Sequence, residues 1–235
     1  GCSNLETVEM HYNGDKINTS TSGVVPYTMT IGSYAFSDDE KLVNINLTEN
    51  VTAIWNNAFS GCKSLVEITL PESLENIGYY AFKGTGITSI TIPKNVKYSG
   101  RESEYDKNGA LAGASKLETV VFEEGMTAIP DYICASDDYT SYIKKIVLPS
   151  GVETIGEYAF YKNYSLTTVS IPKEVKSIGD SAFSGCSNLE TVEMHYNGDK
   201  INTSTSGVVP YTMTIGEYAF SDDEKLVNIN LTENV

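Results

Sequence analysis

The chain has 235 residues, and its 16 lysines and arginines against 31 aspartates and glutamates give a formal net charge of −15. This charge repels phosphate backbones and anionic lipids, so it argues against nucleic-acid binding and against a basic membrane-binding patch. Hydrophobic residues form 40% of the chain, which is enough to bury a core and argues against an acidic disordered tail. No stretch approaches the roughly 18 to 20 apolar residues of a membrane-spanning helix, so we expect no membrane insertion. Residues 1–6 also lack the features of a signal peptide, which fits either a cytosolic protein or an internal piece of an exported one.

The strongest feature of the sequence is an internal copy. Residues 1–51 recur as residues 185–235, and 50 of the 51 positions are identical, the exception being Ser33 against Glu217. Folding constraints fix only the class of a residue, so this near-identity at polar positions points to a recent duplication or to deliberate engineering. We interpret residues 1–235 as a single solenoid, made of one 184-residue unit and the first 51 residues of the next. The copy favours an internal piece of an exported repeat protein.

A shorter repeat of about 23 residues runs through the unit. In chain order, an Ala-Phe pair marks six copies, which begin at Ala35, Ala58, Ala81, Ala159, Ala182 and Ala219. Ala110-Leu111 and Ile133-Cys134 take the place of the pair in two degenerate copies. A short alternating segment, such as residues 65–70, recurs in the copies, and in several of them it ends at a proline such as Pro71. This pattern predicts a short strand with one buried face.

A coil of this length cannot enclose a core, so its apolar side must be buried against the coils on either side. The sequence therefore predicts a solenoid of short parallel strands about 4.8 Å apart, mostly β with some α, with turns and short helical segments at the Ala-Phe pairs. Nine strand copies are expected, from near Leu5 to near Leu231. The 23-residue unit and its Ile-Gly-x-x-Ala-Phe-x-x-Cys signature resemble the BspA-like, or Treponema pallidum type, bacterial leucine-rich repeats along essentially the whole chain.

The cysteines and histidines give little support to catalysis. Cys2, Cys62 and Cys186 occupy the same position after the Phe, and Cys134 takes a Phe position, which favours buried thiols over disulfides or a zinc site. His11 and His195 are copies of one residue, and no catalytic triad or phosphate-binding loop accompanies them. Residues 38–40 and their copy are acidic, and we favour turn hydrogen bonds over a calcium site there. We expect no enzyme activity and no cofactor.

Recognition of a partner is the more plausible role. The outward positions of the expected strands are mostly small and polar, and tyrosine precedes the Ala in five coils, either as a contact stripe or as cover for the neighbouring turn. Three insertions are expected to be loops, which could either contact a partner or have no function. They lie at residues 195–211, with a twin at 11–27, at 99–108 and at 137–142. The candidate contact residues are His195, Tyr196, Asn197, Asp199 and Tyr211 in the first insertion, Tyr98 and Tyr105 at the second, Tyr139 and Tyr142 at the third, and Glu67, Thr69, Thr91 and Lys145 on the sheet face.

The resemblance implies a bacterial cell-surface or secreted protein that adheres to host or matrix proteins, or to other surface proteins, without catalysis. The alternative is a structural stalk that holds another domain away from the cell wall and has no ligand of its own. Both ends of the chain lie within the array and show no polar cap. Because solenoids normally need caps, we also expect end-to-end association or protection of the ends by neighbours.

Overall fold

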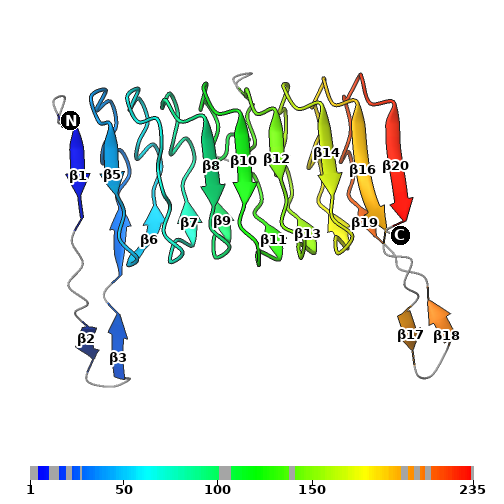
Figure 1. Ribbon diagram of the computed structural model, residues 1–235, viewed down its shortest axis with the longest axis horizontal. Coiled ribbons are helices and arrows are strands. Elements are labelled where there is room, and N and C mark those ends of the chain that lie inside the picture. The colour runs from blue at the N-terminus through cyan, green and yellow to red at the C-terminus, as the bar shows by residue number, and fades with distance from the viewer. Residues whose placement is uncertain are drawn as a thin grey trace.

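A computed structural model describes residues 5–10, 16–19, 23–26, 28–100, 107–137, 141–196, 201–203, 207–209 and 213–233. These residues form a slab of stacked coils, in which the strands follow one another in chain order from β1 to β20 (Figure 1). Nowhere in these ranges is there a helix that could cross a membrane. Most coils contribute one strand to each of two opposite faces, and the apolar side chains lie between the faces.

The first face, which we call the strand face, is built from parallel pairs. It joins β1 to β5, β8 to β10 and β12, and β14 to β16 and β20. Inward side chains alternate with outward ones, as in β8, where Ile90 and Ile92 are buried while Ser89 and Thr91 are exposed. The strands of this face are β1 (Thr7–Glu9), β5 (Asn44–Asn46), β8 (Ser89–Ile92), β10 (Thr119–Phe122), β12 (Lys145–Val147), β14 (Thr168–Ile171), β16 (Thr191–Tyr196) and β20 (Asn228–Glu233).

The opposite face, the rear face, holds two parallel sheets of shorter strands. The first contains β4 (Met29–Ile31), β6 (Val51–Ile54), β7 (Asn76–Ile77) and β9 (Tyr98–Ser99), and the second contains β11 (Ala128–Ile129), β13 (Thr154–Ile155), β15 (Ser177–Ile178) and β19 (Thr214–Ile215). Two antiparallel hairpins lie within the long insertions and pair β2 (Lys16–Thr19) with β3 (Gly23–Pro26) and β17 (Ile201–Thr203) with β18 (Gly207–Val209).

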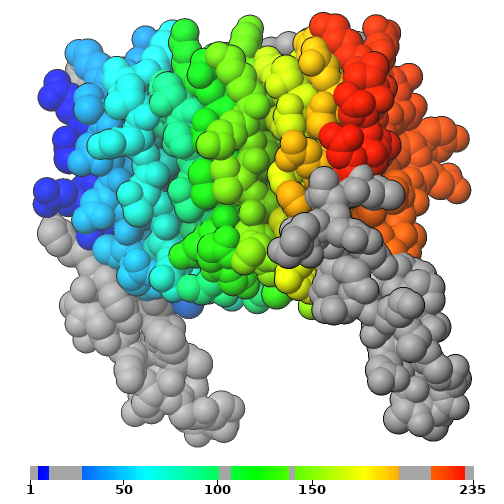
Figure 2. All heavy atoms as spheres, turned by 45° about the vertical axis from the view of Figure 1, so that its right-hand side comes forward, coloured from blue at the N-terminus to red at the C-terminus, as the bar shows by residue number. Residues whose placement is uncertain are grey.

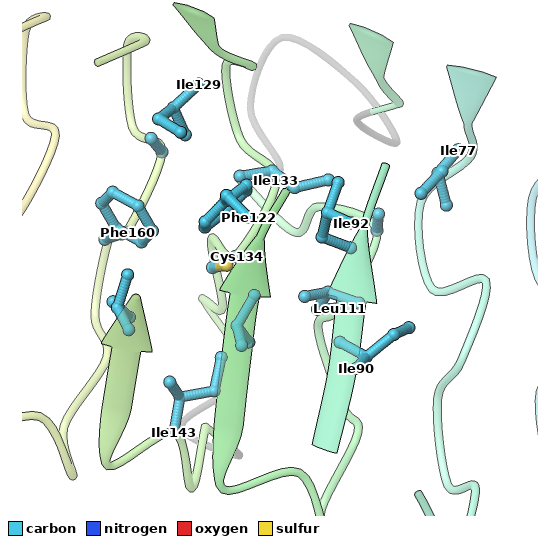
Figure 3. Close-up of a cluster of buried hydrophobic side chains, with 14 of the residues drawn as sticks. Ile77, Ile90, Ile92, Leu111, Phe122, Ile129, Ile133, Cys134, Ile143 and Phe160 are labelled. Atoms are coloured by element: carbon cyan, nitrogen blue, oxygen red, sulfur yellow. The ribbon is translucent and has the colours of Figure 1, made fainter. Parts of the chain in front are cut away.

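The core is a row of stacked rings along the solenoid. Phe59 lies between Phe36 and Phe82, with ring centroids 5.4 and 5.8 Å apart, and Phe183 lies in the same way between Phe160 and Phe220. In the two degenerate coils the Phe position is taken by Leu111 and Cys134, and Phe122 from β10 packs edge-on against Phe160 in that region (Figure 3). Each coil thus fills the space left by its neighbours.

The Ala-Phe segments are turns, and the expected short helices are absent from the described residues because the residue before the Ala is left-handed. Its φ lies between 53° and 60° in seven coils, at Tyr34, Asn57, Tyr80, Tyr132, Tyr158, Ser181 and Tyr218. This backbone conformation costs a non-glycine residue about 1 kcal/mol. It accompanies a ladder between coils, in which the amide of Phe59 donates to Ala81 and that of Phe160 to Ala182, at 2.9 and 2.7 Å.

Eight of the nine expected strands on the strand face are present, and the prediction of a strand at residues 65–70 is wrong. The alternation of burial persists there, since Leu65 and Leu70 are buried while Glu67 and Thr69 are exposed, but the segment pairs with neither β5 nor β8. The turn that leads to β8 is one residue shorter, since five positions separate Phe82 from Ile87 and six separate Phe59 from Leu65. The regular spacing of the coils therefore changes at this junction.

The prediction of buried thiols is confirmed for the three cysteines that the structure describes. Cys62 and Cys186 donate hydrogen bonds to the carbonyls of Phe36 and Phe160. Burial raises the pKa of Cys62 to about 12, and the charge of Asp39 adds to this increase. In the coil where Asn163 replaces the cysteine, its side-chain amide donates to the same carbonyl of Phe160 at 2.7 Å. Cys2 lies outside the described residues.

Aspartate replaces this cysteine in both copies of the 51-residue segment. Asp39 is buried, and its copy Asp223 is half-buried in the last coil. Burial raises the pKa of Asp223 from its ordinary value of 3.8 to about 7, and the neighbouring charge of Asp222 adds to the increase. The last coil therefore contains a carboxyl group that is protonated below neutral pH.

We expect Phe59→Ala to lower the free energy of unfolding by about 3–5 kcal/mol, because it removes a fully buried ring between two other rings. The measurement is urea unfolding followed by circular dichroism. Thr69→Ala, an exposed change in the same coil, is the control and should change the free energy by less than about 0.5 kcal/mol. Equal effects of the two variants would contradict the ring ladder as a source of stability.

We expect Asp223→Asn to remove a pH dependence of the last coil. Because the folded pKa is raised, the protonated carboxyl stabilises this coil fully below the unfolded pKa, and the stabilisation is lost as the pH rises through about 7. Hydrogen exchange of the Ala219 and Leu226 amides should therefore be slower in the variant than in the native chain at about pH 8, and similar in both at about pH 5. Glu224→Gln is the exposed control. If the ratio of the exchange rates of Asp223→Asn and the native chain does not change with pH, the raised pKa of Asp223 is contradicted.

Candidate functional site

The strand face carries the outward side chains that the sequence predicts. Glu67, Thr69, Thr91 and Lys145 are exposed on it, as are the outward residues of β5 and β14. The inward residues of β5 and β14 belong to the core. The predicted orientation of this face is therefore confirmed, and it forms an extended polar surface on a rigid support.

The face is hollowed at its two interruptions. The first hollow, between residues 68–70 and β8, has a volume of about 310 Å³ and brings Thr69 and Thr91 together. Glu72 and Glu123 also line it, and both interact with Lys94: its ammonium group lies 3.1 Å from Glu72 and its amide donates to Glu123 at 2.9 Å. The acidic groups of this hollow are thus partly neutralised by a lysine.

The second hollow, which we call the His195 hollow, lies where β12 and β14 are not paired. It has a volume of about 590 Å³ and brings two predicted contact residues, Lys145 and His195, to one place. The hydroxyl of Ser170 lies 2.8 Å from Nε2 of His195. Lys173 also lines the hollow, and its ammonium group is 4.0 Å from Glu174. None of the nine lining residues is acidic.

The third hollow lies on the rear face, where β9 and β11 are not paired. Its volume is about 800 Å³, and it places the predicted residue Tyr98, which is exposed, near Lys94, Asp131 and Glu157. Acidic and basic side chains line this hollow in similar number. Tyr98 is the one predicted contact residue among its lining residues.

Tyrosine and lysine side chains meet along the edge formed by the Ala-Phe turns. The rings of Tyr132 and Tyr158 stack with their centroids 5.1 Å apart, and the ammonium group of Lys107 lies 4.3 Å from the centre of Tyr158. Tyr132 is buried in this stack, which supports its role as cover for the neighbouring turn, whereas Tyr34 and Tyr218 in the end coils are exposed. The stripe is therefore structural in the middle of the solenoid.

The remaining predicted contact residues are not brought into these hollows by the described structure. Tyr142 is exposed just before β12, and the backbone of Tyr196 is part of β16. Tyr105, Tyr139, Asn197, Asp199 and Tyr211 lie outside the described residues.

Sequence reasoning missed Lys173 and Ser150, which line the His195 hollow. Each follows the proline that ends a strand, so this repeated position after the proline is the signal that could have identified them. Within the described ranges, no three His, Cys, Asp or Glu residues are grouped as metal ligands. The site therefore presents charged and hydrogen-bonding groups at the surface.

Comparisons with known proteins agree with this fold. The chain is similar to a leucine-rich repeat protein from Bacteroides ovatus, with 22% identity and a TM-score of 0.52 over 97% of this chain and 64% of that one. It is similar to the leucine-rich repeat protein of T. pallidum at the same identity and TM-score, over 96% of this chain and 79% of that one. The chain thus spans less than two thirds of the first of these proteins. No match was found among curated proteins.

A family model for the BspA type leucine rich repeat region matches residues 29–140 and 107–206, with six copies of the repeat. These residues include most of the coils described above and carry the Ala-Phe turns on which the stacking depends. The chain belongs to the family of BspA-type leucine-rich repeat proteins.

Proposed function

We propose that this protein is a non-catalytic binding protein of the bacterial cell surface, or a secreted one, that adheres to host or matrix proteins. The family supports a surface role, since BspA-type repeats are typical of bacterial surface proteins. The observation that carries the proposal is the His195 hollow, where Lys145, Lys173 and His195 converge without an acidic residue in a chain of net charge −15.

This concentration of positive charge selects the chemistry of the ligand. A carboxylate in the hollow would accept hydrogen bonds from Lys145 and from the hydroxyl of Ser170, above an apolar floor that includes Val147 and Leu148. The surrounding acidic surface repels a negatively charged ligand everywhere else, so the attraction is local. The hollow therefore suits a glutamate or aspartate side chain of a protein ligand, and the flat polar face beside it suits the rest of that ligand.

The test is to immobilise the chain and measure its binding to a panel of extracellular-matrix proteins and to host cells. We expect at least one partner to bind, and Lys145→Glu to weaken that binding about tenfold or more, because a hydrogen bond to a charged group contributes about 1.5–3 kcal/mol. His195→Ala should weaken it in the same direction. Soluble poly-L-glutamate should compete.

Lys116→Glu is the matched control. Lys116 is also an exposed lysine, but it lies outside the His195 hollow, so the same charge change there should leave binding within about twofold. An absence of binding across the panel by the folded chain contradicts the adhesive function. Binding that Lys145→Glu and Lys116→Glu reduce equally contradicts the His195 hollow as the contact.

A structural stalk is the second candidate, and the nearly identical internal copy favours it. β16 and β20 pair in the same register as β1 and β5, so the two copies continue one and the same array. A stalk should be indifferent to surface charge. If exchange of the insertion at residues 197–211 and Lys145→Glu both leave cell attachment of the parent protein unchanged, the stalk is favoured over the adhesin.

A further inference from the structure

The two copies of the 51-residue segment form an internal comparison at the two ends of the slab. Residues 29–46 are covered on the downstream side by the coil of residues 52–76, while residues 213–230 lie at the end of the slab, where the described structure contains no later coil (Figure 2). On the upstream side the second copy is covered by the coil that holds Phe183. The compared residues are the same apart from Ser33 and Glu217, so differences in their surroundings come from the neighbouring coil.

Apolar residues show what the missing coil would cover. Ile31 is 3% exposed in the first copy, and its counterpart Ile215 is 47% exposed. Ile45 is 3% exposed, and its counterpart Ile229 is 50% exposed. These two pairs come from opposite faces of the slab, so both faces of the last coil are open. Together they leave an apolar surface at the end of the solenoid.

The backbone shows the same difference. In the first copy, the amides of Tyr34, Phe36 and Asp38 donate to carbonyls of the next coil. The acceptors are Asn56, Ala58 and Ser60, at distances of 3.0, 2.8 and 2.7 Å. In the second copy, the amides of Tyr218, Phe220 and Asp222 have no acceptor among the described residues. Three parallel donors thus point out of the end of the solenoid.

The side chains of the two copies differ in the same way as their backbones. The ring of Phe36 stacks on Phe59, whereas among the described residues Phe220 stacks on a ring on its upstream side alone, that of Phe183. The ammonium group of Lys63 lies 2.7 Å from Glu40, and the counterpart of Glu40 in the second copy, Glu224, has no such partner in the described chain. The position of Lys63 holds no lysine in the other Ala-Phe coils, so this ion pair belongs to the coil of residues 52–76.

We propose that the end face formed by Ile215, Tyr218, Phe220, Asp222 and Ile229 is a docking surface for one particular coil, that with the sequence of residues 52–76. A further copy of the 184-residue unit supplies this coil, so units join in series and in register. This inference is independent of the proposed adhesive function. Its basis is that the same residues in the first copy already bind this coil through donors, rings and an ion pair.

Stacking of a second chain by its own first coil fits the end face less well. The described residues before β1, Leu5 and Glu6, contain no Ala-Phe turn. A β1 placed against β20 would therefore offer neither a ring to Phe220 nor carbonyls to the three donors. End-to-end association of whole chains is thus the competing occupant, and the experiment below distinguishes the two.

The test extends the full chain after Val235 with a second copy of residues 52–100. Hydrogen exchange at the amides of Tyr218, Phe220 and Asp222 is compared with exchange at Tyr34, Phe36 and Asp38 in the same sample. We expect exchange at the first three amides to slow roughly tenfold or more, toward the rates of their counterparts. An extension of equal length made of Gly, Ser and Asn is the control and should leave them fast.

Two substitutions on the end face sharpen the result. Ile215→Asn changes a side chain that the added coil would bury, and it should reduce the slowing in the extended chain while leaving the unextended chain folded, since Ile215 is exposed there. Glu217→Ser is the matched control, because the first copy naturally has serine at this position, Ser33, and the residue is exposed in both the covered and the open copy. It should leave the slowing at Phe220 and Asp222 unchanged.

Three outcomes overturn the proposal. The first is fast exchange at the three amides despite the extension, including the case in which the added coil does not fold. The second is equal slowing by the Gly, Ser and Asn control. The third is slowing in the unextended chain as its concentration rises, with a matching increase in mass by light scattering, because chains then stack on each other directly.

Discussion

The structure depends on a one-directional ladder of hydrogen bonds between coils. In the Ala-Phe turns that a following coil covers, alternate amides donate to carbonyls of that coil, as Ser181, Phe183 and Gly185 do to Glu217, Ala219 and Ser221. The left-handed residue before the Ala accompanies this alignment throughout, at the expense of backbone strain. The ladder fixes the spacing at which the phenylalanine rings stack and at which Cys62 and Cys186 reach a carbonyl of the preceding coil. No coil can satisfy these groups alone, so stability is shared between neighbours.

The same regularity explains where the hollows lie on the surface. Identical coils give a uniform face, and the hollows occur where the repeat is disturbed. The first hollow lies beside the shortened turn before Ile87, and the His195 hollow lies beside β12, which follows the insertion at residues 137–142. Binding capacity thus resides in the irregular coils, and the regular coils hold these positions rigid.

The exposure of several candidate residues could be predicted from their own segments of the sequence. That these residues line one hollow could not be predicted. Lys145 and His195 were each predicted as outward or inserted residues, but they are 50 positions apart in the chain. They line one hollow because β12 and β14 are not paired, and the repeat pattern contains no sign of that gap. Lys173 and Ser150 follow prolines at the strand ends, where the pattern gives them no orientation. A repeat pattern predicts the features that are common to all coils, whereas these contacts arise from features in which neighbouring coils differ.

The sequence by itself determined the solenoid, the phase of its coils, the buried thiols and the polar outward face, because a 23-residue period and alternating hydrophobicity leave one way to bury the apolar side. Only the tertiary structure decided that the Ala-Phe segments are left-handed turns, that residues 65–70 lose their strand pairing and that basic side chains gather around His195. The physical reason is that these features depend on the fit between adjacent coils. The clearest case is one sequence in two places, where Ile31 is buried and Ile215 is exposed solely because a following coil covers the first and not the second.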